Sequence, residues 1–394
     1  MAGSSGEPSA MIATLRNQPQ AAAGLHFVQF PLPGLNQMDF TALAADTEQT
    51  VFFMTSALKN AAVDRLHYVS IHMRRVYDYL LENPVAIALL QVARDASGEL
   101  RFALNADFVE AAVANPTTLV VAQLNEGFVA PMGAPLAMRL DYLVTGASDA
   151  PEFLSTASTK EDLVAQQIGE HVASLIRDGD CLQTGIGAIP GAVLAALGDK
   201  RDLGFHGGLI DDEVLDLIEQ GVITGARKTL DVGQHVAGMA LGSGGFIDRL
   251  AARDDVLLVG ANRTHEAAVI AQLDNFVSIN SAVQVDLLGQ INGEFAGGRQ
   301  ISGTGGSVDF MRSARGSRGG RSIVALPSTA RGGSVSRIVR RVEMVTALRS
   351  DVDMVVTEHG VAHLRDLSMP ERARRLIAIA APEFRSELQN GEAT

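Results

Sequence analysis

The sequence predicts an α/β fold of two related open domains with mainly parallel sheets. Short runs of valine, isoleucine and leucine alternate with longer segments of helical period, which is the pattern of parallel strands covered by helices. The runs occupy residues 118–124, 256–261, 322–327 and 353–360. The chain has 394 residues, enough for two domains of ordinary size, and its 39 glycines supply the tight turns that such units need.

Two segments have a clear helical pattern. In residues 161–177, apolar side chains recur at spacings of three and four, which is typical of a helix with one buried face. Residues 370–380 show the same period and open with Pro370, a residue favoured in the first turn of a helix. Both helices are expected to be structural.

The chain also repeats itself. Residues 3–15 and 185–197 share glycine, proline, alanine and leucine at the same offsets, which predicts a glycine turn that leads into a helix with an early proline. Two weaker similarities between segments follow in the same order along the chain. They pair residues 65–72 with 202–209 and residues 119–125 with 354–360.

The repeat predicts one domain over residues 1–155 and a second over residues 156–394, which holds most of the motifs, joined around residues 148–160. The first copy begins abruptly at Gly3. We therefore expect it to lack a helix and a strand that precede the glycine turn in the second copy.

Composition and charge limit the classes of partner and cofactor that are expected. The formal net charge of −13 would repel a phosphate backbone, so nucleic acid is not expected as a partner. The one cysteine, Cys181, cannot form an internal disulfide and has no metal-site spacing around it, which predicts a metal-free protein in a reducing cytoplasm. No apolar stretch approaches the roughly 18 residues of a membrane span, and no signal peptide is evident, so no membrane partner is expected.

Five further segments carry motifs of greater length. They are residues 182–198, 275–293, 301–312, 322–339 and 355–385. In sequence and order they resemble the acetyl-CoA hydrolase/transferase family, and within it the 4-hydroxybutyrate CoA-transferase type of family I CoA-transferase. A looser resemblance runs through residues 90–126. The resemblance implies a CoA-transferase fold, a coenzyme A thioester as substrate, no covalently bound cofactor, and a homodimer or higher homo-oligomer.

Three glycines form the first candidate site. In GTGGSVDF, Gly303, Gly305 and Gly306 allow positive φ and close backbone approach. Their N–H groups can hold a thioester oxygen as negative charge develops on it, which makes the segment a candidate oxyanion hole. A tight turn between two strands is the alternative.

Two polar residues resemble active-site residues of the family. Asn280 matches an asparagine that lies beside the reacting acyl group and donates a hydrogen bond, although a strand-end asparagine that caps a turn is the alternative. Glu358 follows an apolar strand and matches a glutamate thought to assist the chemistry, because burial would suit it to acid–base work. An ion-paired structural glutamate is the alternative there.

Other residues resemble the CoA-binding part of the family. Gly185, Gly187 and Ala188 match a turn that lines the thioester region, although a glycine turn before a helix also occurs without a ligand. Arg331 takes the place of a lysine near the CoA. Four further arginines are expected on a loop, where they either meet CoA phosphates or are simply solvated. These are Arg312, Arg315, Arg318 and Arg321.

The resemblance fails at one position. In the family, a glutamate attacks the thioester, forms a mixed anhydride and then carries CoA as a glutamyl thioester. Gly208 takes its place, and residues 214–228 continue the match without a gap. Asp211, Asp212 and Glu213 would have to bend back to substitute for it. The histidines His206 and His359 lack ligand-spaced partners, so packing or hydrogen bonding is expected of them and not metal binding.

Three functions remain open from these residues. Hydrolysis of an acyl-CoA, or an unusual non-covalent acyl transfer, is placed first, with Glu358 or a water network activating water beside Gly208. A lyase is the second, in particular an acyl-CoA decarboxylase that stabilises a thioester enolate in the same oxyanion site. A non-catalytic acyl-CoA binder is the third. The acyl group cannot be read from the sequence.

Overall fold

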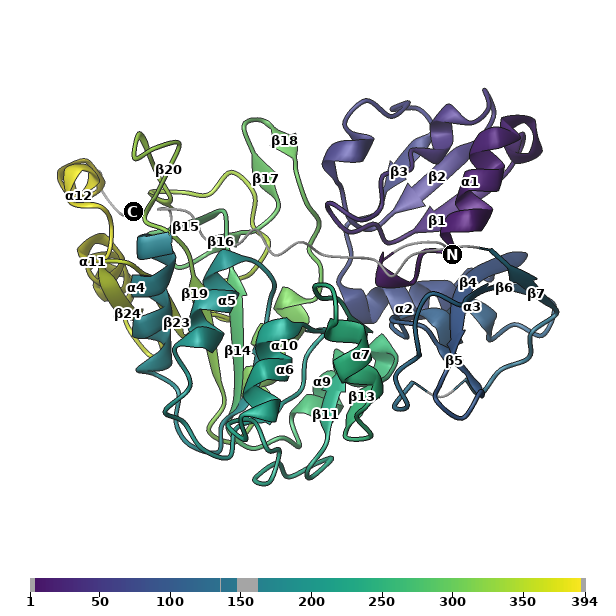
Figure 1. The fold of residues 1–394 in the computed structure, drawn as a ribbon. Coiled ribbons are helices and arrows are strands. Elements are labelled where there is room, and N and C mark those ends of the chain that lie inside the picture. Colours follow the sequence, from purple (N-terminus) through teal and green to yellow (C-terminus); the bar gives the residue numbers. More distant parts are fainter. Residues whose placement is uncertain (1–3, 135, 147–161, 391–394) are drawn as a thin grey trace.

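A computed structural model describes residues 4–134, 136–146 and 162–390. The expected junction around residues 148–160 lies outside the described residues. Two halves follow one another along the chain, and Figure 1 shows the first half, in purple and blue, beside the second, in teal to yellow. The prediction of an α/β fold with mainly parallel sheets is confirmed.

The first half contains two separate sheets. One is fully parallel and has the order β1-β2-β3; its strands are β1 (His26–Gln29), β2 (Glu48–Val51) and β3 (Leu66–Tyr68). The other has the order β5-β4-β6-β7, and only β5 runs antiparallel. Its strands are β4 (Ile87–Arg94), β5 (Leu100–Phe102), β6 (Leu119–Asn125) and β7 (Tyr142–Thr145). The helices here are α1 (Ser9–Asn17), α2 (Met73–Glu82) and α3 (Val109–Val113), with short 3-10 turns η1 (Ser4–Gly6), η2 (Pro19–Ala22), η3 (Phe40–Ala42) and η4 (Ser56–Leu58).

A six-stranded sheet organises the second half, in the order β24-β23-β19-β14-β8-β9, and all pairs except β23 with β24 are parallel. The strands are β8 (Cys181–Thr184), β9 (Gly204–Phe205), β14 (Phe276–Ser281), β19 (Arg321–Ala325), β23 (Met354–Thr357) and β24 (Gly360–His363). Because the parallel strands point the same way, the loops at their carboxyl ends share one edge.

Both faces of this sheet are covered. Ile323 on β19 belongs to the cluster that packs under helices α4, α5 and α6, whereas its neighbour Val324 belongs to the cluster on the other face, with α10 and α11. This alternation follows from the period of two along a strand. The helices are α4 (Asp162–Ala173), α5 (Ala188–Ala195), α6 (Asp212–Glu219), α7 (Phe246–Ala251), α8 (Ala261–Thr264), α9 (Ala267–Ile270), α10 (Ser307–Gly316), α11 (Met369–Ala378) and α12 (Pro382–Gln389).

Short strands extend this core. They are β10 (Leu209–Ile210), β11 (His235–Ala237), β12 (Met239–Ala240), β13 (Val256–Leu258), β15 (Gln284–Asp286), β16 (Ile291–Asn292), β17 (Phe295–Ala296), β18 (Arg299–Gln300), β20 (Thr329–Ala330), β21 (Val335–Ser336) and β22 (Ile338–Val339). Strand β11 pairs in parallel with β13, and a bridge from His206 to Val236 links it to the end of β9. The second half thus has a small parallel group similar to β1-β2-β3.

The two predicted helices form. Residues 161–177 contain α4, and residues 370–380 contain most of α11, which begins with a capping box between Ser368 and Glu371. In the second copy of the repeat, the glycine turn leads into α5, with Pro190 inside its first turn. In the first copy, Pro8 caps α1, and Gly3 lies outside the described residues. Among the described residues, each helix is too short or too polar to cross a bilayer.

An apolar cluster joins the halves. It combines Phe52 and Met73 of the first half with Leu209, Met239 and Ala261 of the second. The loop before α10 meets the same boundary, because a Cβ on Gly303 would lie 2.5 Å from the carbonyl oxygen of Phe52. The first half therefore forms one wall around the segment that follows β9.

Candidate active site

Most of the predicted site residues gather along the carboxyl edge of the six-stranded sheet. Gly208 lies beyond β9, Gly185 follows β8, Asn280 is near the end of β14, and Glu358 follows β23. Strands β8, β14 and β19 separate β9 from β23. At about 4.8 Å per strand, the ends of β9 and β23 are roughly 19 Å apart.

Gly208, where the sequence predicts that a nucleophilic glutamate is missing, borders an imidazole. A Cβ on Gly208 would lie 3.2 Å from both Cε1 and Nε2 of His265, and 3.8 Å from Cε2 of Phe310. The backbone is fixed here, because the Gly208 carbonyl accepts hydrogen bonds from the amides of Gly238 and Met239, each at 3.0 Å. The nearest described atoms around the Cβ position thus belong to two rings and include no carboxylate.

The three nearby acidic residues are turned to other partners. Asp211 caps α6 by accepting from the Val214 amide at 3.0 Å, and burial raises the pKa of its carboxyl to about 7. Asp212 accepts from the amide and the hydroxyl of Ser243. Glu213 reaches α5, where its Oε1 would lie 3.4 Å from a Cβ on Gly191. None of the three carboxylates is among the nearest atoms around the Cβ position of Gly208.

The glycine segment lies between β18 and α10, so it leads into a helix instead of joining two strands. Gly305 has a φ of +55°, which favours glycine, and its carbonyl accepts from the Met73 amide at 3.1 Å. Gly306 is the cap residue of α10 and has no side chain to satisfy the first amides of that helix. The segment therefore offers a helix N-terminus at the boundary between the halves.

His265 lies between this segment and Gly208. A Cβ on Gly306 would lie 2.3 Å from His265 Nε2, so only glycine fits there. The ring is 2% exposed, its centroid is 4.4 Å from that of Phe310, and its Nδ1 is 2.7 Å from the hydroxyl of Thr264. Nε2 has no hydrogen-bond partner among the described residues. Burial, with a smaller effect of His206, lowers the pKa of His265 to about 3, so the ring is neutral at ordinary pH.

Asn280 is held by a neighbouring strand. Its amide Nδ2 donates to Gln183 Oε1 at 3.0 Å, and Gln183 Nε2 donates back at 3.4 Å. Both side chains are buried. The Asn280 amide keeps one N–H beyond this pair. Gln183 also lies near the segment after β9, because its Cγ would be 3.6 Å from a Cβ on Gly207.

Glu358 is bound to the start of the β20–β21 hairpin. Its carboxylate accepts from the Ser328 amide at 2.8 Å and from the Ser328 hydroxyl at 2.5 Å, and its side chain is 11% exposed. Burial lowers the pKa of Arg337, and the charge of Glu358 opposes that shift. The carboxylate therefore fixes the loop that leads to Arg331, which is exposed in the turn of this hairpin with a φ of +51°.

The turn after β8 is open to solvent. Gly187 caps α5 with a φ of +114°, a conformation that favours glycine, and a Cβ there would meet no atom within 4 Å. Ala188, the first residue of α5, is exposed, and Gly185 is partly exposed. A ligand has access to this turn.

The four arginines expected on a loop are fixed in regular structure or paired. Arg312 and Arg315 lie in α10, where they bind Asp351 and the Ser350 carbonyl. Arg318 pairs with Asp274, and Arg321 begins β19 and pairs with Asp180. The expectation of a loop is correct for Arg318, which follows α10 and is exposed, and wrong for the other three, because Arg312 and Arg315 continue the helix and Arg321 begins a strand.

Three candidate residues from the sequence remain, two histidines and the one cysteine. His206 is fully buried, donates from Nε2 to the Thr264 carbonyl at 3.1 Å, and has its pKa lowered to about 3 by burial. His359 lies 3.8 Å from Glu358. Cys181 is 1% exposed, and burial raises the pKa of its thiol to about 12. Over the described ranges, His, Cys, Asp and Glu side chains nowhere form a group of three that could hold a metal ion.

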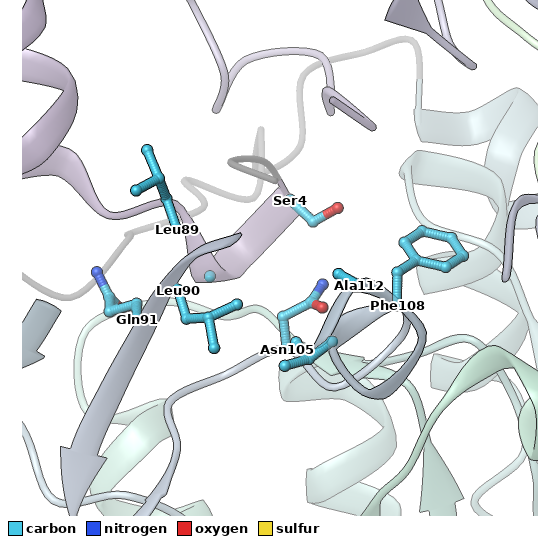
Figure 2. A pocket seen from close by; sticks show the side chains of 9 residues that line it. Ser4, Leu89, Leu90, Gln91, Asn105, Phe108 and Ala112 are labelled. Atoms are coloured by element: carbon cyan, nitrogen blue, oxygen red, sulfur yellow. The ribbon is translucent and has the colours of Figure 1, made fainter. Parts of the chain in front are cut away.

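A small cavity lies in the first half. Ser4, Asn105 and Phe108 are among the residues that line it (Figure 2). Its volume is about 30 Å³, room for roughly one water. Next to Asn105 is Asp107, whose fully buried carboxyl would lie 1.8 Å from a Cβ on Gly238. Burial raises the pKa of Asp107 to about 8, and its Oδ1 has no partner among the described residues.

Sequence reasoning missed His265, Phe310 and Asp107. His265 lies at the end of the one-turn helix α8, in a segment without periodicity, and only the fold brings it to Gly208. The spacing of residues within one motif cannot predict a contact between segments that are far apart in the sequence. Asp107 follows Asn105 in a loop of the first half, where the resemblance was loose.

A mainly parallel α/β scaffold carries a glycine loop, a buried amide pair and a solvent-exposed turn along one edge of its sheet. This is the arrangement of the CoA-transferase class of proteins. The model of the acetyl-CoA hydrolase/transferase C-terminal domain matches residues 242–391. The 4-hydroxybutyrate coenzyme A transferase of Clostridium kluyveri is 37% identical over 394 residues, which covers 98% of this chain and 91% of that protein. The chain belongs to the acetyl-CoA hydrolase/transferase family and is an acyl-CoA hydrolase/CoA-transferase family enzyme.

Two solved structures are similar over nearly the whole chain. RipA from Yersinia pestis has a TM-score of 0.86 at 29% identity and covers 99% of this chain and 91% of that one. The 4-hydroxybutyrate CoA-transferase of Porphyromonas gingivalis has a TM-score of 0.75 at 31% identity, with 97% and 95% covered. The family resemblance seen in the sequence is thus confirmed.

Proposed function

We propose that this chain hydrolyses an acyl-CoA thioester by direct attack of water, without a glutamyl intermediate. The observation that carries the proposal is the surroundings of Gly208, where the nearest atoms belong to His265 and Phe310 and the neighbouring acids are bound elsewhere. A covalent relay requires a nucleophile at the thioester carbon. Water is the nucleophile that remains.

The proposed reaction needs no group that is covalently bound to the enzyme. Water adds to the carbonyl carbon, the C–S bond breaks, and the sulfur leaves with the electron pair and takes a proton from the added water. Gly303, Gly305 and Gly306 hold the oxygen as charge develops on it, and Asn280 supplies a further N–H. The exposed turn with Gly187 and the hairpin with Arg331 bind the CoA part.

Glu358 contributes to this function through the hairpin. Its two carboxylate oxygens are both engaged by Ser328, one by the backbone amide and one by the hydroxyl. We therefore assign it a positioning role for the CoA-binding hairpin. The two domains over residues 1–155 and 156–394 and the homo-oligomeric state belong to the same proposal.

The test uses the purified chain and a panel of acyl-CoAs, including a malonyl-type thioester. Free thiol, carbon dioxide and product mass are followed together. Thiol release with the free acid, independent of added acetate, supports hydrolysis. Carbon dioxide with an intact thioester would show a decarboxylase instead, and binding without turnover would show an acyl-CoA binder.

A further inference from the structure

A cavity of about 280 Å³ lies at the amino ends of β19 and β23. Its lining includes Arg321, the first residue of β19, Met354, the first residue of β23, and His363, the last residue of β24. Because β19 and β23 are parallel, their amino ends lie at the opposite edge of the sheet from Asn280 and Glu358. The cavity is therefore separate from the candidate active site.

Three arginines line this cavity, and two of them are matched by buried acids. Arg321 pairs with Asp180. Arg365 holds Asp353 by a two-point contact, in which its Nε and Nη2 donate at 2.8 and 2.6 Å. Arg177, the third, is exposed and forms no ion pair with another residue that the structure describes. The cavity thus has a positive charge that no ion pair compensates, in a chain whose formal net charge is −13.

Hydrogen-bond donors are left over at this cavity, and free carboxylates are not. The guanidinium of Arg177, the Nη1 of Arg365 and the ring of His363 bond to no acceptor within the described ranges. Asp353 is the one acid in the described lining, and both of its oxygens already accept from Arg365. Guanidinium groups bind carboxylates and phosphates through paired N–H donors. The arrangement therefore favours an oxyanion over a cation.

Apolar side chains form another part of the wall. Met354 is 6% exposed, and Leu175, which follows α4, is partly buried. An inorganic ion gains nothing from such a surface, whereas a short hydrocarbon chain attached to the anion would lose its contact with water there. The volume is just below the range of about 300–1,000 Å³ that is usual for small-molecule sites. The ligand that fits best is therefore small and partly apolar.

We propose that this cavity is a second ligand site, which binds a small organic oxyanion with a short apolar chain. Arg177 and the Nη1 of Arg365 hold the anionic head, which is a carboxylate or a phosphate monoester, and Leu175 and Met354 contact the chain. The inference does not rest on the proposed hydrolysis, because the cavity contains none of the residues assigned to that reaction.

Titration calorimetry of the purified chain tests this site with butyrate and butyl phosphate, which distinguish the two head groups. Saturable binding of at least one of them is expected. Neutral butyramide should not bind, and inorganic phosphate should bind more weakly than the organic anion. Absence of saturable binding by both organic anions overturns the inference. Equal binding of butyramide or of inorganic phosphate overturns it as well.

Arg177→Gln locates the bound anion. Because Arg177 is exposed and unpaired, its loss leaves no buried acid alone, and we expect the Kd to rise about tenfold. Arg299→Gln is the matched control, since Arg299 is also exposed but lies on β18, away from the lining. An equal Kd in the two variants contradicts the assignment.

A second readout reports on the cavity itself. Nitrogen NMR of histidine-labelled protein should show the His363 ring signal, assigned with His363→Gln, moving as butyrate or butyl phosphate saturates the chain. Ser174→Trp, at an exposed position in the lining, should fill the cavity and abolish both the shift and the binding. Saturable binding with an unmoved His363 signal would place the anion elsewhere and overturn the inference.

Discussion

The imidazole of His265 lies 3.2 Å from the point where a side chain on Gly208 would begin. A longer side chain at this position would extend past the rings of His265 and Phe310. The proposal of direct attack by water depends on this contact, because the nearest described atoms there belong to the two rings.

Restoring the carboxylate should restore transfer. Gly208 has a φ outside the left-handed region, so Gly208→Glu meets no backbone barrier, although His265 must shift by a few tenths of an ångström. We expect the variant to gain CoA transfer from an acyl-CoA to acetate, measured as acetyl-CoA formation. Gly208→Gln, with the same shape and no nucleophile, is the control. Equal activity of the two variants would contradict the expectation.

The amide pair between Asn280 and Gln183 should stabilise the fold as well as the site. Asn280→Ala leaves the Gln183 amide buried without a partner, which is expected to lower the free energy of unfolding by about 1–3 kcal/mol. Urea denaturation measures this change. In a double-mutant cycle with Gln183→Ala, the second substitution should cost clearly less than it does alone. Strict additivity of the two changes would rule out the pairing.

Glu358→Gln distinguishes positioning from acid–base catalysis. A general acid or base contributes about 10²–10⁴ to the rate, so its loss would appear in kcat. Because the carboxylate binds Ser328, we expect instead a rise in KM for the acyl-CoA and a fall in kcat of less than about tenfold. Ser328→Ala should share this phenotype. A kcat loss above about 100-fold in Glu358→Gln alone would return Glu358 to the chemical step.

Asp107 gives the fold a pH dependence of defined sign. Its pKa is about 8 in the folded protein and near 3.8 when unfolded, so between these values the folded state holds a proton that the unfolded state has lost. Its contribution to stability is complete below about pH 4 and is lost as the pH rises toward 8. Asp107→Asn removes this loss. The variant's advantage in urea denaturation should therefore grow from pH 5 to pH 8, and a constant difference would contradict the assignment.

The sequence was a good guide to local structure and a poorer one to contacts. Helices α4 and α11 and the turn before α5 follow from periodicity, proline and glycine, which act within one or two turns of chain. Arg312 and Arg315 of α10 were expected on a loop, and the acidic partner of Arg312, Asp351, is far away in the sequence. The contact of His265 with Gly208 and Gly306 likewise depends on three distant segments meeting, and no spacing rule encodes it.

Attack by water without an enzyme-bound intermediate is tested most directly by the mass of the intact protein, quenched while it turns over an acyl-CoA. Hydrolysis of this kind predicts an unmodified chain of 41.5 kDa throughout the reaction, with free acid and CoA accumulating. A chain that carries an acyl group or CoA would contradict it, because some side chain would then serve as the nucleophile that Gly208 lacks.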